Sequence, residues 1–165
     1  MRAGVRVGVD VGSVRVGVAN CDPAGLIATP VATLRRGRGD LDALSRLVTE
    51  REAIEVVVGL PTTLAGRHGA AAEAAQAYAE TVAAVVAVPV RLVDERLSTV
   101  GAQRGLHASG VDTRRGRSVI DQAAAVIILQ AALDAERRSG TAPGRLVGRT
   151  PATDDSPRDR GADTR

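Results

Sequence analysis

The stretch RVGVDVGSVRVGVAN, residues 6–20, constrains the fold more than any other part of the chain. Valines alternate with small or charged residues on both sides of Gly12-Ser13, which is the period of a half-buried strand. A two-residue loop that begins with glycine is typical of a type II′ turn, so we expect a β-hairpin in which Asp10 faces Arg15. One face of this hairpin would consist of valine.

The opposite face of the predicted hairpin carries small residues and one acid. Gly8 would face Gly17 across the two strands, with Asp10 beside them. Two facing glycines leave room for the close approach of a helix, a ligand or a metal ion. The carboxylate of Asp10 is therefore a first candidate for chemistry, although a cross-strand ion pair with Arg15 would explain the same residues equally well.

The later elements follow in an order that is typical of an α/β domain. Periodicity predicts a strand at 26–34, a helix at 41–51, a buried strand at 54–61, a helix at 70–88, a strand at 90–99 followed by a helix to about residue 109, and a helix at 118–138. Three strands in a meander followed by two crossovers give a five-stranded mixed sheet flanked by helices. We expect one domain at 1–140 and a disordered tail at 141–165.

Composition excludes several classes of function. No long apolar run is free of charges and the chain begins directly with a strand, so we expect a cytoplasmic protein with no membrane span. A single cysteine provides neither a disulfide framework nor a thiolate metal site. The net charge of +3 permits nucleic acid as a partner, but Tyr78 is the only aromatic residue, which excludes base stacking on aromatic side chains.

Acidic residues occur where an α/β sheet places its sites. Asp94 and Glu95 stand at the carboxyl end of a predicted strand, near the level of Asp10. The helix that carries Asp121 has a stripe of small residues that could lie on the glycine face of the hairpin. Carboxylates without histidine or thiol are the ligands of Mg²⁺ or Mn²⁺. Two such ions, roughly 3.5–4 Å apart, would suit phosphodiester hydrolysis.

Each acid also has a purely structural interpretation. Ser118 and Asp121 have the spacing of a helix capping box, and Asp94 and Glu95 could be ordinary acids near a helix start. Spacing alone does not decide between Asp94 and Glu95. Two arginine-rich runs, predicted to be flexible loops, could clamp phosphates or be solvated surface. They contain Arg35, Arg36, Arg38, Arg114, Arg115 and Arg117.

Four ordered motifs resemble those of the YqgF/RuvX family: GVDVGSVRVGVA at 8–19, VVVGLP at 56–61, VDERLST at 93–99, and the arginine-rich loop before VIDQAAAVIILQ at 119–130. The resemblance covers about residues 4–138. It implies a ribonuclease H-like fold and a metal-dependent nuclease that either processes the 5′ end of pre-16S ribosomal RNA or resolves Holliday junctions. It also implies that Asp10, Glu95 and Asp121 are the catalytic and metal-binding acids.

From these observations we expect an endonuclease that uses two Mg²⁺ or Mn²⁺ ions, with Arg15 and the two arginine runs on the phosphate backbone. A junction resolvase would need a dimer, whereas an RNA-processing nuclease can act alone, so monomer and homodimer both remain open. A kinase or actin-like ATPase would share the hairpin motif, but such enzymes close two domains around a nucleotide. A non-catalytic nucleic-acid-binding module is the alternative from another class.

Overall fold

The computed structural model describes residues 1–62, 69–97 and 114–148, and within them the chain forms one mixed sheet. The strand order is β3-β2-β1-β4-β5-β6. The strands are β1 (Arg6–Val11), β2 (Arg15–Cys21), β3 (Ala28–Arg35), β4 (Glu55–Leu60), β5 (Val90–Asp94) and β6 (Arg145–Leu146). The first three form an antiparallel meander, and β4 lies parallel to both β1 and β5. The predicted α/β fold with a mixed sheet is confirmed.

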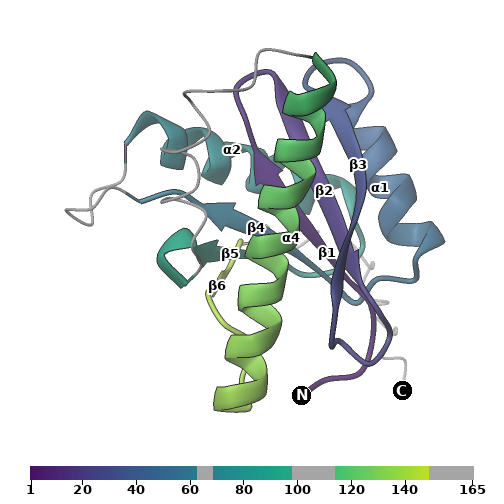
Figure 1. Ribbon diagram of the computed structural model, residues 1–165, viewed down its shortest axis with the longest axis vertical. Coiled ribbons are helices and arrows are strands. Elements are labelled where there is room, and N and C mark those ends of the chain that lie inside the picture. The colour runs from purple at the N-terminus through teal and green to yellow at the C-terminus, as the bar shows by residue number, and fades with distance from the viewer. Residues whose placement is uncertain (63–68, 98–113, 149–165) are drawn as a thin grey trace, which may run out of the picture.

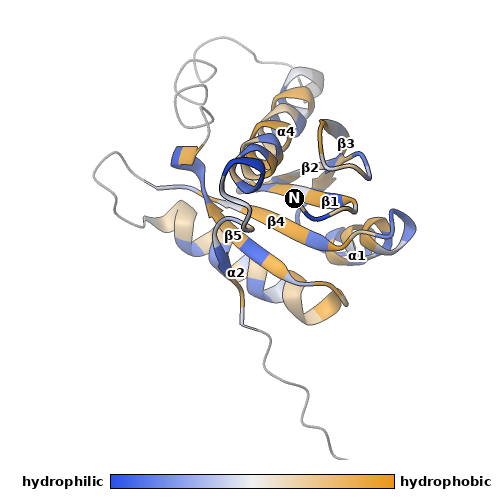
Figure 2. Ribbon diagram, turned by 90° about the horizontal axis from the view of Figure 1, so that it is seen from below, coloured by the Kyte–Doolittle hydropathy of each residue, from blue (hydrophilic) through white to orange (hydrophobic). Residues whose placement is uncertain are grey.

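Helices cover both faces of this sheet. Helices α1 (Asp40–Glu50) and α2 (Ala70–Val85) lie on one face, and the long helix α4 (Arg114–Ser139) crosses the other, as Figures 1 and 2 show. A short 3-10 helix, η1 (Glu95–Leu97), follows β5. The three helices predicted at 41–51, 70–88 and 118–138 are confirmed with shifted ends, and the one expected to end near residue 109 lies outside the described residues.

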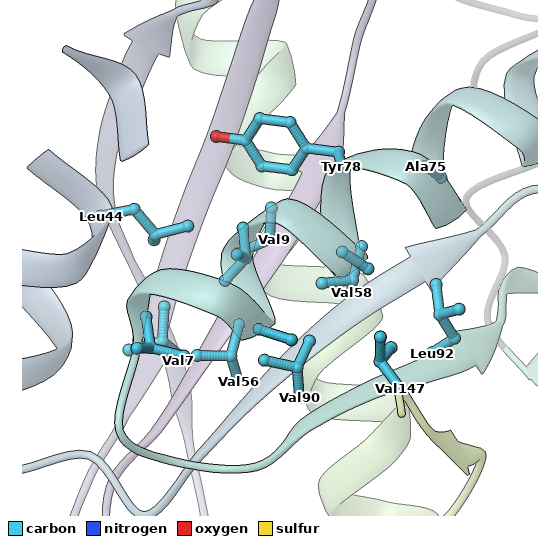
Figure 3. Close-up of a cluster of buried hydrophobic side chains, with 14 of the residues drawn as sticks. Val7, Val9, Leu44, Val56, Val58, Ala75, Tyr78, Val90, Leu92 and Val147 are labelled. Carbon is cyan, nitrogen blue, oxygen red and sulfur yellow. The ribbon is translucent and has the colours of Figure 1, made fainter. Parts of the chain in front are cut away.

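The valine face of the hairpin packs against α1 and α2. Val7 and Val9 of β1 are at most 1% exposed and lie beside Val56 and Val58 of β4. Figure 3 shows these four valines in the same buried cluster as Tyr78 of α2. β-Branched side chains on a pleated sheet pack well, and full burial of each is worth about 1.5–3 kcal/mol. This layer is therefore the main core, and it fixes which side of β1 faces the opposite helix.

The hairpin register differs from the predicted one. The last facing pair is Val11 with Val16, which leaves four residues between the two positions instead of two, and Asp10 faces Gly17 rather than Arg15. The Gly12 N–H donates to the Arg15 carbonyl at 2.8 Å and closes the longer loop. The shift is two residues, so every side chain of the paired strands stays on its predicted face.

Helix α4 begins four residues before the predicted start, which overturns two expectations. Ser118 lies inside the helix, so the capping box with Asp121 does not form. Instead the Ser118 hydroxyl donates to Thr33 Oγ1 at 3.0 Å, and the Thr33 hydroxyl donates to the Ser118 carbonyl at 2.9 Å. The run at 114–117 is helical rather than a loop. These hydrogen bonds join the first turns of α4 to β3, an edge strand.

The sheet has a sixth strand that the sequence did not predict. β6 pairs antiparallel with β5 and comes from the segment assigned to the tail. The next residue, Val147, is 6% exposed and joins the main core. The packed part of the chain therefore continues past residue 140, and the remainder of the expected tail, 149–165, lies outside the described residues.

One stretch of α4, Gly116–Ser139, is long and apolar enough to cross a membrane, among the residues that the structure describes. One side of this stretch lies on the sheet, with Ala125, Ile128, Leu129 and Leu133 at 2% exposure or less. Length and composition alone are weak grounds for a membrane span, because the core helix of a globular domain meets the same criteria. Packing on the sheet accounts for the apolar residues on that side of α4, and 33% of its apolar 18-residue window is buried.

Candidate active site

The candidate site is built around Asp10, the last but one residue of the central strand β1. Its side chain lies on the α4 face and the residue is 5% exposed. Gly17 of β2 faces it directly. On the other side, Val9 pairs with Val58, so the next residue of β4, Gly59, lies beside Asp10 at the same level. Two glycines therefore flank the buried carboxylate in one row of the sheet.

The backbone of α4 comes down onto the first of these glycines. A Cβ atom on Gly17 would overlap the carbonyl oxygen of Asp121, so only glycine permits this approach. The backbone of α4 at Asp121 therefore lies over Gly17, the residue that faces Asp10, as the small-residue stripe of α4 predicts.

Glu95 lies over the second glycine. The residue begins η1, directly after β5, and is 7% exposed. A Cβ atom on Gly59 would lie 3.1 Å from Glu95 Oε1 and 2.6 Å from Ile128 Cδ1. Gly59 is not among the predicted site residues, although an isolated glycine inside a buried strand is a recognised sign of close approach. Glu95 and the backbone of Asp121 thus lie over the two glycines that flank Asp10 on the α4 face.

The carboxylates do not form a closed metal site as they stand. In residues 1–62, 69–97 and 114–148, no three His, Cys, Asp or Glu side chains are grouped closely enough to hold one ion. Asp121 Oδ2 accepts a hydrogen bond from Arg15 Nε at 2.8 Å. Hard oxygen donors over two glycines nevertheless fit Mg²⁺ or Mn²⁺, provided that Asp121 exchanges Arg15 for the ion.

Asp94 and Glu95 have different surroundings, which separates the two adjacent acids. Asp94 Oδ1 accepts hydrogen bonds from the Thr62 hydroxyl at 3.0 Å and the Arg96 N–H at 2.8 Å, and Oδ2 accepts from Arg96 Nε at 2.8 Å. These bonds, led by those from the Arg96 side chain, lower the pKa of Asp94 to about 2. Asp94 therefore joins the segment after β4 to η1, and its partners Thr62 and Arg96 are not among the predicted site residues.

The predicted phosphate-binding arginines fall into distinct groups. Arg35 is exposed and faces Arg15 across β2 and β3, at the same end of the sheet as Asp10. Arg38 is also exposed, in the following loop, and Arg117 is exposed on α4. Arg114 and Arg115 belong to the first turn of α4 by backbone, and their side chains lie outside the described part of the structure.

Arg36 is placed differently from the other arginines of its run. Its guanidinium lies 5.4 Å from the centre of the Tyr78 ring, and Nη1 donates to the Gly12 carbonyl at 3.2 Å. The Tyr78 hydroxyl in turn donates to Asp40 Oδ2 at 3.2 Å. Burial, together with the charge of Asp40, raises the pKa of Tyr78. Arg36 therefore supports the hairpin loop from the α2 face, and its side chain is engaged away from the α4 face.

Comparisons with known proteins agree with this architecture. The sequence model of the RuvX family, described as Holliday junction resolvase, matches residues 4–135. A protein from Kineococcus radiotolerans is 58% identical over 151 residues, covering 89% of this chain and 80% of the relative. One from Streptomyces avermitilis is 59% identical over 152 residues, covering 89% and 96%. Both carry the name "Putative pre-16S rRNA nuclease".

Among solved structures, Thermus thermophilus RuvC in complex with a Holliday junction substrate is similar in fold. The TM-score is 0.55 at 15% sequence identity, and the match covers 86% of this chain and 99% of RuvC. A second T. thermophilus RuvC structure matches with a TM-score of 0.54 at 16% identity. At such low identity the likeness concerns the fold alone, and it confirms the predicted ribonuclease H-like architecture.

Proposed function

This chain belongs to the RuvX family, and from that premise we propose that it is a divalent-metal-dependent endonuclease with Asp10, Glu95 and Asp121 as its catalytic acids. The observation that carries the proposal is the row formed by Gly17, Asp10 and Gly59. Gly17 admits the backbone of α4 at Asp121, and Gly59 admits the Ile128 side chain with the Glu95 carboxylate beside it, so the elements that carry both acids approach the sheet next to Asp10.

The three acids would hold Mg²⁺ or Mn²⁺, and we expect two ions. Bound there, the ions would supply an activated water and stabilise the leaving oxygen of a phosphodiester. The protein contributes rigidity: Asp10 sits on the central strand, and the Asp94–Arg96 ion pair fixes η1, on which Glu95 lies. Such fixed placement of reacting groups is a major part of what a nuclease site must provide.

Phosphate binding is assigned to the arginines on the same side as the acids. Arg15 and Arg35 face each other across two strands, and two like charges in that position are unfavourable without an anion near them. A nucleic-acid phosphate would satisfy both guanidinium groups with charge-assisted hydrogen bonds. Arg38, Arg114, Arg115 and Arg117 would extend the contact along the backbone, and Arg36 would act only through the hairpin loop.

We propose the 5′ end of pre-16S ribosomal RNA as the substrate, acted on in the cytoplasm, because the close relatives carry a name of that kind. The second candidate substrate is a four-way DNA junction. The description of the family model and the fold likeness to RuvC favour it. Two symmetric cuts in a junction need two sites and hence a homodimer, whereas one cut in an RNA can be made by a monomer.

The test is cleavage of both substrates side by side, with Mg²⁺, with Mn²⁺ and with EDTA, together with the oligomeric state in the same buffer. Asp10→Asn should lower cleavage by at least about 100-fold, because several kcal/mol of transition-state stabilisation depend on the ions. Folding and nucleic-acid binding should persist. Full activity in Asp10→Asn would refute the mechanism, and binding without cleavage by the wild type would favour a non-catalytic binding module.

A further inference from the structure

The carboxylate of Asp121 is engaged by Arg15. Arg15 Nε donates to Asp121 Oδ2 at 2.8 Å, and the two side chains are 29% and 22% exposed. The pair joins the start of β2 to the second turn of α4. Both side chains are thus accessible to exchange, unlike those of a fully buried ion pair.

A metal ion and a guanidinium compete for the same carboxylate. Arg15 carries a positive charge in all conditions, and at this separation it repels a divalent cation as well as masking Asp121 Oδ2. Arg15 also faces Arg35 in register, so an anion between these two strands relieves a like-charge contact. In the structure Asp121 is the anionic partner of Arg15, and a nucleic-acid phosphate is the alternative.

We infer that Arg15 is a positioning residue that acts as the counterion of Asp121 in the free protein and keeps its affinity for divalent cations low. This inference rests on the proposed function, since it assumes that Asp121 takes part in binding the ion. It goes further by giving Arg15 a second role beside phosphate contact. The metal site would reach full strength only when Arg15 leaves Asp121.

The experiment measures Mn²⁺ affinity of the full chain without nucleic acid, by titration calorimetry and by the signal of free Mn²⁺ in electron paramagnetic resonance. Arg15→Gln should bind Mn²⁺ about 3- to 10-fold more tightly than the wild type, as expected for removal of one nearby, half-exposed charge. Arg15→Lys keeps the charge and should restore weak binding. Arg35→Gln removes the same charge one strand away and should change the affinity by less than about twofold.

A double-variant cycle separates the contact from a general charge effect. In an Asp121→Asn background, Arg15→Gln should no longer tighten Mn²⁺ binding, because the carboxylate that Arg15 masks is gone. Equal affinities of wild type, Arg15→Gln and Arg35→Gln would overturn the inference while leaving the proposed function intact, provided that Asp10→Asn still weakens binding. If no variant shows Mn²⁺ binding that depends on Asp10, both the inference and the proposed function fail.

Discussion

Arginines and carboxylates lie near both ends of α4, but the carboxylates are held differently at the two ends. Figure 1 shows one end beside the chain's N-terminus and the other beside the β1–β2 loop. At the first end, Glu136 accepts hydrogen bonds from Arg2 at 3.0 Å and from Arg6 at 3.3 Å. Glu55 accepts from Arg2 at 3.0 Å and from Arg91 at 2.8 Å. Each carboxylate there is held by two arginines.

At the other end the acids are placed by backbone geometry. Asp121 and Glu95 lie over Gly17 and Gly59, and the ion pair of Asp121 with Arg15 is partly open to solvent. The residues of β1 on the α4 face are Arg6, Gly8 and Asp10. Arg6 belongs to the first cluster and Asp10 to the second, so the two clusters lie four positions apart along one strand. Carboxylates held by two arginines serve stability, whereas Asp121, whose partner Arg15 is partly exposed, can exchange that partner for a ligand.

The largest expected difference between the two ends is in stability. Glu136→Gln should lower the free energy of unfolding by about 3–5 kcal/mol, because it leaves the buried guanidinium group of Arg6 without its charged partner, whereas Arg2 is partly exposed and keeps Glu55. Asp121→Asn should cost no more than about 1 kcal/mol, as for an exposed ion pair, while abolishing cleavage. Urea unfolding measures both, and equal losses would contradict the division between the ends.

Acid should act on the first end through Glu136. Hydrogen bonds from Arg2 lower the pKa of Glu136 from 4.5 to about 2. A depressed folded-state pKa stabilises the protein above the unfolded value, and this contribution is lost as the pH falls toward 2. The stability difference between wild type and Glu136→Gln should therefore shrink by about 3 kcal/mol between pH 5 and pH 2. Unfolding at several pH values tests this, and a constant difference would refute it.

Gly17→Ala should damage the second end through geometry rather than charge. The added Cβ would overlap the backbone carbonyl of Asp121, so α4 must move away from β2 at a cost of about 1–3 kcal/mol. Cleavage should fall more than stability does, because Asp121 moves with the helix. Gly148→Ala, where nothing lies within 4 Å, is the matched control and should change neither property.

The smallest expected effects separate two adjacent arginines. Arg35→Gln should weaken nucleic-acid binding a few-fold and lower the salt dependence of binding by about one unit of slope, as for one lost phosphate contact. Arg36→Gln should leave the salt dependence unchanged and lower the melting temperature, since it removes the contact with Tyr78 and the bond to Gly12. Affinity measured across a salt series decides between them, and identical slopes would contradict the assignment.

Local patterns predicted most of the fold because they reflect physical constraints within a few residues. Alternating valines correctly predicted which face of the hairpin joins the core. The predicted loop was two residues too short, but the register moved by two residues, so no side chain of the paired strands changed face. The capping box predicted from Ser118 and Asp121 was wrong, because its spacing is only a local preference. The hydrogen bonds that Ser118 makes with Thr33 instead join residues 85 positions apart. Long-range contacts of this kind decided the start of α4.

The same distinction between local patterns and long-range contacts applies to the candidate site. Asp10, Glu95 and Asp121 could be selected from strand ends and family motifs, and the structure places Glu95 and the backbone of Asp121 over the two glycines that flank Asp10. The ion pair of Arg15 with Asp121 could not be predicted, because the predicted hairpin register placed Arg15 opposite Asp10. The structural role of Arg36 depends on Tyr78 of α2, an element that local sequence cannot place.

The two-residue strand β6 also has a consequence for how the chain avoids self-association. Without it, β5 would present a row of unpaired backbone groups that another chain could extend into an intermolecular sheet. β6 occupies this edge, and the Val147 N–H extends the pairing by donating to the Val90 carbonyl at 2.8 Å. A strand this short, with Arg145 in it, is a poor template for further strand addition. The segment after residue 140 thus protects the colloidal stability of the domain, and variants truncated at that point would be prone to aggregate.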